Sequence, residues 1–131
     1  MAPIHIRPDG EGIAVPHEAT DGVIAFVEQS MAPRHLITGH IHHDNDVWIY
    51  VLDGEVGVRV GDEEATGSKG DYLLKPRGIP HAMWNPGNEP NRFIEVLTPG
   101  NDKIFRGQED DSITWFDDWT DELRERYGVD T

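Results

Sequence analysis

Short apolar runs alternate with segments rich in glycine, proline and acidic residues along most of the chain. The runs recur about every eight to twelve residues, a spacing typical of an all-β sandwich or barrel. Strands are predicted at residues 23–29, 37–42, 47–52, 55–60, 71–75, 81–85 and 92–98. Residues 61–70 are acidic and rich in turn-forming residues, so we expect an exposed loop there that can contain a short edge strand.

The clearest hairpin spans residues 47–60. Asp53 and Gly54 are expected to take the two positive-φ positions of a type I′ turn between its strands. Because successive side chains of a strand point to opposite faces, the valine and isoleucine residues of the first strand are expected inside. Trp48 and Tyr50, which alternate with them, are then predicted to lie outside, against a second sheet or a second subunit.

Residues 1–100 are predicted to form one barrel that includes the N-terminal strands. The composition changes after Pro99, since ten of the last 31 residues are Asp or Glu, too many for a second core. We therefore expect residues 101–131 to be an acidic tail that packs on the barrel through its aromatic residues. A short helix is predicted to begin at Thr120 and to end before Gly128, with a cap at each end.

The charge and composition of the chain limit its function. It has 131 residues, 11 basic and 25 acidic, with a net charge of −14, so nucleic acid and anionic membranes are not expected partners. It contains no cysteine, which excludes disulfides, thiolate zinc sites and cysteine nucleophiles. No apolar run reaches the roughly 20 residues of a membrane span, and the first residues do not resemble a signal peptide. We expect a cytoplasmic protein of one domain.

Four of the seven histidines, His35, His40, His42 and His43, fall within nine positions. In an extended strand His40 and His42 point to the same face, so their imidazoles can converge on one metal ion, whereas His43 points away. His81 follows a turn-forming Pro-Arg-Gly segment and can supply a third imidazole. A single inward histidine is more often an ordinary core residue, but three at these spacings favour a metal site.

Two sequence motifs support this interpretation. The pattern GX5PXGX2HX3N is matched at every fixed position, by Gly70, Pro76, Gly78, His81 and Asn85. An HXH pair followed by a closing glycine is matched by His40, His42 and Gly54. From about residue 39 to residue 100 the chain therefore resembles the cupin family. The resemblance implies a jelly-roll-like β-barrel of two antiparallel sheets, a metal site of His40, His42 and His81, and a homodimer.

The motif that contains the HXH pair departs from the family at its acidic ligand. The family's glutamate falls at Val47, which cannot bind a metal, and Arg34 stands where the motif's opening glycine would be. Asp46 has the right spacing from His42, but a shift of one residue along a strand turns its side chain away unless a bulge intervenes. The resemblance thus implies three imidazole ligands with the remaining positions open to water or substrate, and leaves Asp46 as an alternative fourth ligand.

A residue that replaces the missing carboxylate as a base is predicted at Glu95, which shares a strand face with Phe93 and Leu97. The alternative is that Glu95 lies on the wetter face of an edge strand. Four residues are predicted at the substrate pocket. Met83 and Asn85 lie two and four positions after His81, so alternation puts them on the same face as that histidine. Val47 stands at the position of the family's acidic ligand, and Arg34 is expected at the rim. The alternatives for these four are core packing and, for Arg34, an ordinary surface position.

Three functions are compatible with these residues. The first is a metal-dependent enzyme on a small phenolic or enolic substrate, with Fe(II)-dependent dioxygenation as the leading chemistry and Zn, Mn, Ni, Co or Cu as other possible ions. The second is a non-redox cyclase or isomerase, similar to a polyketide cyclase, in which the ion polarises a carbonyl and Glu95 moves a proton. The third is a cupin that binds a small molecule without converting it.

Overall fold

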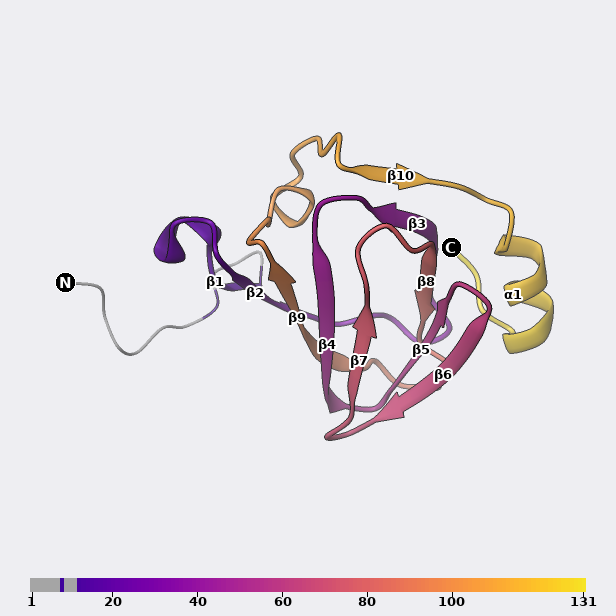
Figure 1. Ribbon diagram of the computed structural model, residues 1–131. Helices are drawn as coiled ribbons and strands as arrows, with labels where there is room; N and C mark the ends of the chain where they lie inside the picture. Colours follow the sequence, from indigo (N-terminus) through magenta and orange to yellow (C-terminus); the bar gives the residue numbers. More distant parts are fainter. Residues whose placement is uncertain (1–7, 9–11) are drawn as a thin grey trace.

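Two five-stranded antiparallel sheets face each other in the computed structural model, which describes residues 8 and 12–131 (Figure 1). The first sheet contains, in spatial order, β1 (Ile13–Val15), β2 (Ala25–Gln29), β9 (Arg92–Thr98), β4 (Asp46–Asp53) and β7 (Tyr72–Lys75). The second contains β10 (Ile113–Trp115), β3 (Leu36–His42), β8 (His81–Trp84), β5 (Glu55–Val60) and β6 (Glu63–Ser68). Two 3-10 turns, η1 (His17–Thr20) and η2 (Ile104–Arg106), and one helix, α1 (Thr120–Tyr127), complete the described part. The predicted all-β fold of two antiparallel sheets is confirmed.

All seven predicted strands are present, with ends that differ from the prediction by two residues at most. The strands β1 and β10 were not predicted, because each has only three residues and too little alternation to reveal it. Each forms by pairing with a longer neighbour, β1 with β2 and β10 with β3. The segment 61–70 contains β6, the edge strand that the sequence allowed there.

The hairpin of β4 and β5 shows the predicted division of faces. Val47, Ile49 and Val51 are fully buried between the sheets, whereas Trp48 is 42% exposed. The predicted turn type is wrong: Gly54 has φ 73°, but Asp53 is not among the described non-glycine residues with positive φ. A single left-handed glycine is enough here, because Asp53 remains in β4 and its carboxylate accepts a hydrogen bond from the Gly54 amide.

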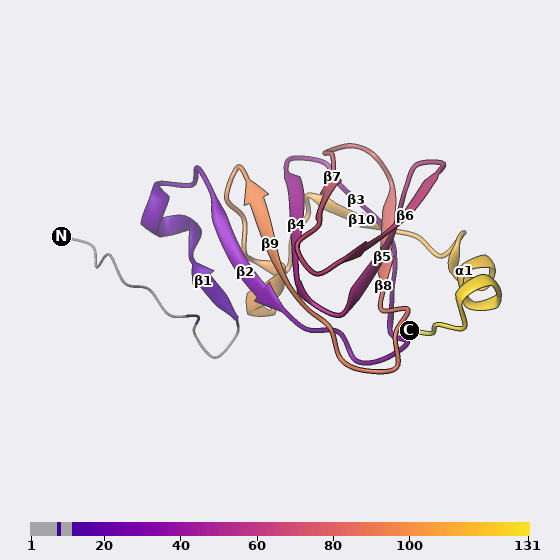
Figure 2. The same ribbon diagram turned by 90° about the horizontal axis from the view of Figure 1, so that it is seen from below.

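The C-terminal residues wrap around the barrel. β10 adds an edge strand beside β3, at the end of the barrel drawn at the top of Figure 1. The chain then reaches α1, which lies beside the second sheet in both views (Figure 2). The helix ends at Tyr127, and Gly128 caps it with φ 64°, as predicted. The predicted N-terminal cap is wrong, because Trp119 occupies that position without a capping side chain and the Thr120 hydroxyl hydrogen-bonds Thr38 instead.

The outer face of the first sheet is apolar where β4 and β7 lie side by side. The rings of Tyr50 and Tyr72 lie with centroids 4.6 Å apart, and Tyr72 is 71% exposed. Whether this face contacts a second subunit stays a prediction. Among the described residues, no helix has the length and apolar character needed to cross a membrane.

Candidate metal centre

Three histidines from two neighbouring strands meet inside the barrel. His40 in β3 pairs directly with His81 in β8, and His42 lies two residues further along β3 on the same face. One ring nitrogen of each lies within 4.8 Å of the others. All three residues are buried, with exposures of 4%, 5% and 0% for His40, His42 and His81. The structure therefore brings together the three predicted ligands.

Backbone carbonyls fix the orientation of two of the rings. Nδ1 of His40 lies 2.8 Å from the Thr38 carbonyl oxygen, and Nδ1 of His81 lies 3.3 Å from that of Ile79. Because a carbonyl only accepts, the tautomer that satisfies these contacts has the hydrogen on Nδ1 and leaves a lone pair on Nε2. The same arrangement holds histidine ligands in metal proteins.

The two Nε2 atoms lie 3.0 Å apart. With the hydrogen on Nδ1 of both rings, two lone pairs face each other at this separation and repel unless a cation lies between them. Two nitrogens bound to one tetrahedral zinc ion at 2.0–2.1 Å are separated by roughly 3.3 Å, close to the observed distance. Nδ1 of His42 is also buried without a hydrogen-bond partner among the described residues. The donor set thus fits a divalent metal ion.

Burial keeps these imidazoles neutral. It lowers the pKa of His40 from 6.5 to about 3 and that of His42 to about 4, with a smaller contribution from the charge of Lys75 in each case. Burial lowers the pKa of His81 further in the same direction. A metal-binding imidazole must be unprotonated, so the three rings are in the binding-competent state at neutral pH.

Carboxylate ligands are absent from the histidine cluster among the described residues. Val47 is fully buried in an apolar cluster with Ile13, Val27 and Leu97. Asp46 points away from the site, because its carboxylate accepts a hydrogen bond from the Arg77 backbone amide at 2.9 Å and pairs with the Arg77 guanidinium at 3.2 Å. The alternative of Asp46 as a fourth ligand is therefore wrong.

A cavity of about 130 Å³ lies beside the histidines. It is lined by Ile37, His40, His42, Lys75, Met83, Glu95, Ile104, Phe105, Ile113 and Trp115. Its volume is below the 300–1,000 Å³ usual for drug-sized ligands, so it accommodates a small molecule or one end of a larger one. The indole of Trp115 stacks on His40 with centroids 4.6 Å apart and is half exposed, which places it between the cavity and solvent. The C-terminal segment therefore completes this cavity.

Glu95 faces the cavity and is only 5% exposed. The alternative of a wet edge strand is wrong, because β9 lies between β2 and β4 in the first sheet. Glu95 Oε2 lies 3.6 Å from Nζ of Lys75, an ion pair with both side chains almost fully buried. Lys75 was not predicted as a site residue, since lysine is rarely buried. The sequence contained one signal of its burial. Alternation along the strand puts Lys75 on the same face as Leu73, opposite to the exposed Tyr72 and Leu74.

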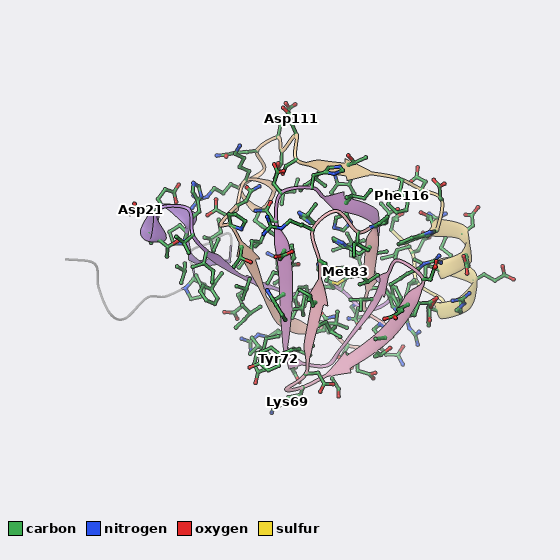
Figure 3. The ribbon with its side chains drawn as sticks, in the orientation of Figure 1. Asp21, Lys69, Tyr72, Met83, Asp111 and Phe116 are labelled. Atoms are coloured by element: carbon green, nitrogen blue, oxygen red, sulfur yellow. The ribbon has the colours of Figure 1, made fainter. Side chains whose placement is uncertain are left out.

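The four predicted pocket residues have different positions. Met83 lines the cavity, and Figure 3 shows it inside the barrel. Val47 belongs to the core. Asn85 lies beyond the end of β8, where its amide donates to the carbonyls of Met31, Ala32 and Glu89, so it organises loops and does not line the cavity. The Arg34 guanidinium lies elsewhere on the surface, bonded to Asn88 and to the Tyr127 carbonyl.

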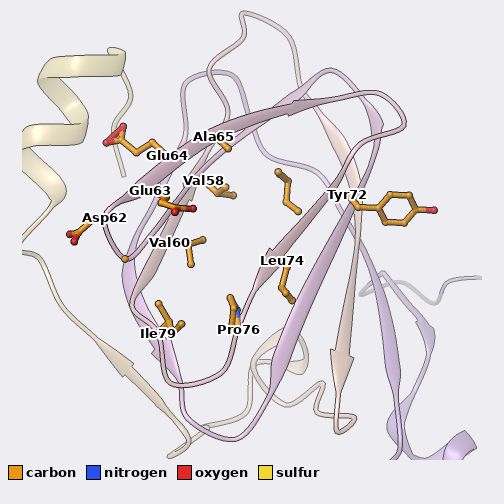
Figure 4. A pocket seen from close by; sticks show the side chains of 12 residues that line it. Val58, Val60, Asp62, Glu63, Glu64, Ala65, Tyr72, Leu74, Pro76 and Ile79 are labelled. Carbon is orange, nitrogen blue, oxygen red and sulfur yellow. The ribbon is translucent and has the colours of Figure 1, made fainter.

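The structure has a second hollow and a second group of potential metal ligands, but neither has the features of a metal centre. A larger hollow of about 640 Å³ lies between β5, β6 and β7 (Figure 4). It is lined mainly by apolar side chains, with Asp62 of the β5–β6 turn and Glu63 and Glu64 of β6, and without a histidine. His17, Glu18 and Asp102 form a second group of potential ligands. The Asp102 carboxylate is fully buried and is already bonded by His17 and Arg106, so this group is an internal clamp.

Two antiparallel sheets closed around inward-facing histidines from adjacent strands define the cupin class of β-barrel. Residues 27–97, just over half of the chain, match the family described as the cupin domain. The chain therefore belongs to the cupin family.

The chain is also similar to individual known proteins. The chain is 33% identical over 81 residues to the tetracenomycin polyketide synthase protein TcmJ of Streptomyces glaucescens, a match that covers 62% of this chain and 53% of TcmJ. It thus spans about half the length of that relative. Among solved structures, TT1209 of Thermus thermophilus is 30% identical with a TM-score of 0.57, over 71% of this chain and 89% of that one. KdgF of Halomonas sp. is 19% identical with a TM-score of 0.63, over 76% and 90% of the two chains, and shows the fold alone.

Proposed function

We propose that this cupin is a metal-dependent enzyme that moves a proton on a small, enolisable carbonyl compound, in a cyclisation or isomerisation. One observation carries the proposal: a carboxylate, Glu95, lies in the wall of the same buried cavity as His40 and His42. A positioned carboxylate beside a Lewis acid is the arrangement that abstracts a proton next to a carbonyl group.

The three histidines would hold the metal through one nitrogen each. When bound, the ion supplies Lewis acidity that makes the hydrogens next to a coordinated carbonyl more acidic. Imidazole ligands suit zinc as well as iron, cobalt, nickel and copper, so the donor set leaves the ion open, and proton transfer requires no redox-active metal. The carboxylate-free cluster leaves positions for a chelating, anionic substrate.

Glu95 would accept the substrate proton and return it to another atom. Its carboxylate is buried, and the cavity wall around it is largely apolar, with Ile37, Ile104, Phe105 and Ile113. These side chains keep bulk water from the reacting atoms, which strengthens electrostatic interactions within the site. Trp115, at the boundary with solvent, would limit access.

The substrate class is inferred from the relative. TcmJ is named as a polyketide synthase protein, and it is 33% identical to this chain over the shared region. Polyketide chains carry carbonyl groups on alternate carbons, so the hydrogens between them are acidic and the enolates chelate metals. A compound with this 1,3-dicarbonyl pattern is the substrate we infer.

Dioxygenation with Fe(II) is the second candidate. It is favoured by the apolar Val47 at the family's glutamate position, since three ligands leave room for both a substrate and O2. It differs from the first candidate in one measurable respect, the consumption of oxygen.

Proton exchange tests the proposal directly. Metal-loaded protein is incubated in D2O with a panel of 1,3-dicarbonyl compounds at a pH where uncatalysed exchange is slow, and deuterium incorporation is followed by NMR. We expect Glu95→Gln to lower the catalysed rate about 100-fold or more, while Glu28→Gln, at a surface ion pair with Arg92, leaves it unchanged. Wild-type exchange in Glu95→Gln would remove Glu95 as the base. Oxygen uptake matching substrate loss would favour the second candidate.

A further inference from the structure

Lys75 is a cavity residue whose part in the chemistry is still unassigned. It is 1% exposed, in a chain with only three lysines. Lysine is almost never fully buried unless it is paired, because removing its charged group from water is costly. Its partner in the structure is Glu95, which lies in the wall of the same cavity with Oε2 3.6 Å from Nζ.

The structure offers two partners to the Lys75 nitrogen. Nζ donates to the Met83 sulfur at 3.3 Å, and a thioether is a poor acceptor. Glu95 Oε2 lies at 3.6 Å, beyond a normal hydrogen bond. An ammonium group has three hydrogens to donate, so beside these two partners it can donate a further hydrogen bond to a ligand oxygen.

The position of Lys75 relates it to the metal centre. Lys75 lies in the wall of the same cavity as His40 and His42. It acts on all three histidines as a nearby positive charge that lowers their pKa values. The cavity thus combines a metal-binding end with a second hydrogen-bond donor, and an oxygen-rich anion is the ligand that satisfies both.

We propose that Lys75 is a substrate-binding residue that donates hydrogen bonds to a carboxylate or enolate oxygen of the substrate, beyond the oxygens that face the three-histidine centre. The inference rests on the proposed function and narrows its substrate class to 1,3-dicarbonyl compounds with a further acidic oxygen. Hydrogen bonds to charged groups contribute about 1.5–3 kcal/mol, so Lys75 provides a preference for such an anion of about ten-fold or more.

A pair of probes isolates this interaction. Acetopyruvate and its methyl ester share the same 1,3-dicarbonyl group, but only the acid has a free carboxylate. Each is titrated by calorimetry into Co(II)-loaded wild type, Lys75→Met and Lys69→Met. Lys69 is the matched control, because it is exposed at the opposite end of the barrel from the C-terminal segment (Figure 3). The metal attracts the carboxylate of the acid equally in all three proteins. A difference between them in the ratio of the acid and ester affinities therefore reports the contribution of the substituted lysine.

We expect wild type and Lys69→Met to prefer the acid, and Lys75→Met to lose about ten-fold or more of this preference while it keeps its affinity for the ester. An unchanged ratio in Lys75→Met overturns the assignment of Lys75 and leaves the proposed function intact. A wild-type protein that binds no Co(II), which is measured before either probe is added, overturns both.

The folding of the variant is checked by far-UV circular dichroism. If Lys75→Met alone is unfolded because Glu95 has lost its partner, the double variant Lys75→Met/Glu95→Gln is used, in which no buried charge of the pair remains. The comparison is then made with Glu95→Gln, which retains Lys75. Loss of the acid preference in the double variant relative to Glu95→Gln supports the proposal, and an equal ratio in both overturns it.

Discussion

Lys75 in β7 lies directly across the β4–β7 ladder from Val47, the residue at the family's glutamate position. Residues opposite each other in an antiparallel pair point to the same face, so both side chains are inside the barrel. The family's acidic ligand position thus carries a neutral side chain, and its neighbour carries a basic one. The carboxylate in the wall of the cavity comes instead from Glu95, on the other side of β4.

The Lys75–Glu95 pair predicts strongly non-additive stability effects. Lys75→Met leaves the Glu95 carboxylate buried without its partner, so we expect a loss of about 3 kcal/mol. Removing both charges in Lys75→Met/Glu95→Gln should recover most of that loss. The free energy of unfolding of wild type, both single variants and the double variant is measured in urea. Additive losses would show that the two charges do not interact.

The metal-free protein should lose stability on mild acidification. The pKa values of His40 and His42 are about 3 and 4 in the folded state and 6.5 in the unfolded chain. The unfolded state therefore binds more protons below pH 6.5, and the stability present above that pH falls as the pH drops toward 4. Each histidine contributes about 1 kcal/mol per pH unit in that window.

Denaturation of the metal-free protein at pH 7, 6 and 5 measures this slope. Carboxylates whose pKa values are lowered, such as that of Asp102, titrate below this range, so they do not obscure the histidines. A His42→Gln variant should show a shallower slope than wild type. Equal stability at pH 7 and pH 5 would contradict the account of buried, neutral imidazoles.

Trp115 should report metal binding by fluorescence. Its indole stacks on His40, so Co(II) or Cu(II) bound at the histidines would lie close to the ring and quench its emission. We expect a saturable quench in wild type and a much smaller one in Trp115→Phe. Trp48→Phe is the control, because Trp48 lies on the outer face of the first sheet. The same quench in both variants would place the bound metal away from Trp115.

The clamp at Asp102 should support the cavity wall. Burial alone would raise the pKa of Asp102, but hydrogen bonds from Arg106 and His17 hold it below its ordinary value. This clamp connects η1 to η2, which carries two cavity residues, Ile104 and Phe105. Asp102→Asn is predicted to lower the free energy of unfolding by about 2 kcal/mol, measured in urea. Asp111→Asn, at an exposed loop position, is the control, and equal stability of the two variants would contradict the role of the clamp.

The sequence predicted the features that depend on the alternation of apolar and polar residues along a single strand. The period of two helped to locate seven strands, placed His40 and His42 on one face, and grouped Glu95 with Phe93 and Leu97, but it did not decide whether that face was buried. It failed at Asn85 because the rule applies only within a strand, and β8 ends at Trp84. Lys75 was missed because its charge argues against burial, and only the complete cavity shows what surrounds it. The contribution of β10 was missed because its pairing with β3 joins residues about 70 positions apart.

Metal analysis tests the central claim most directly. Five proteins are loaded with Co(II) or Zn(II), dialysed, and their metal content is measured by elemental mass spectrometry. They are wild type, His40→Ala, His42→Ala, His81→Ala and His43→Ala. His43 is the matched control, because it follows His42 in the chain but its ring lies at the surface against Thr114. We predict one ion per chain in wild type and His43→Ala, and its loss in the other three variants. Retention of the ion in His81→Ala, or its absence from wild type, would contradict the account.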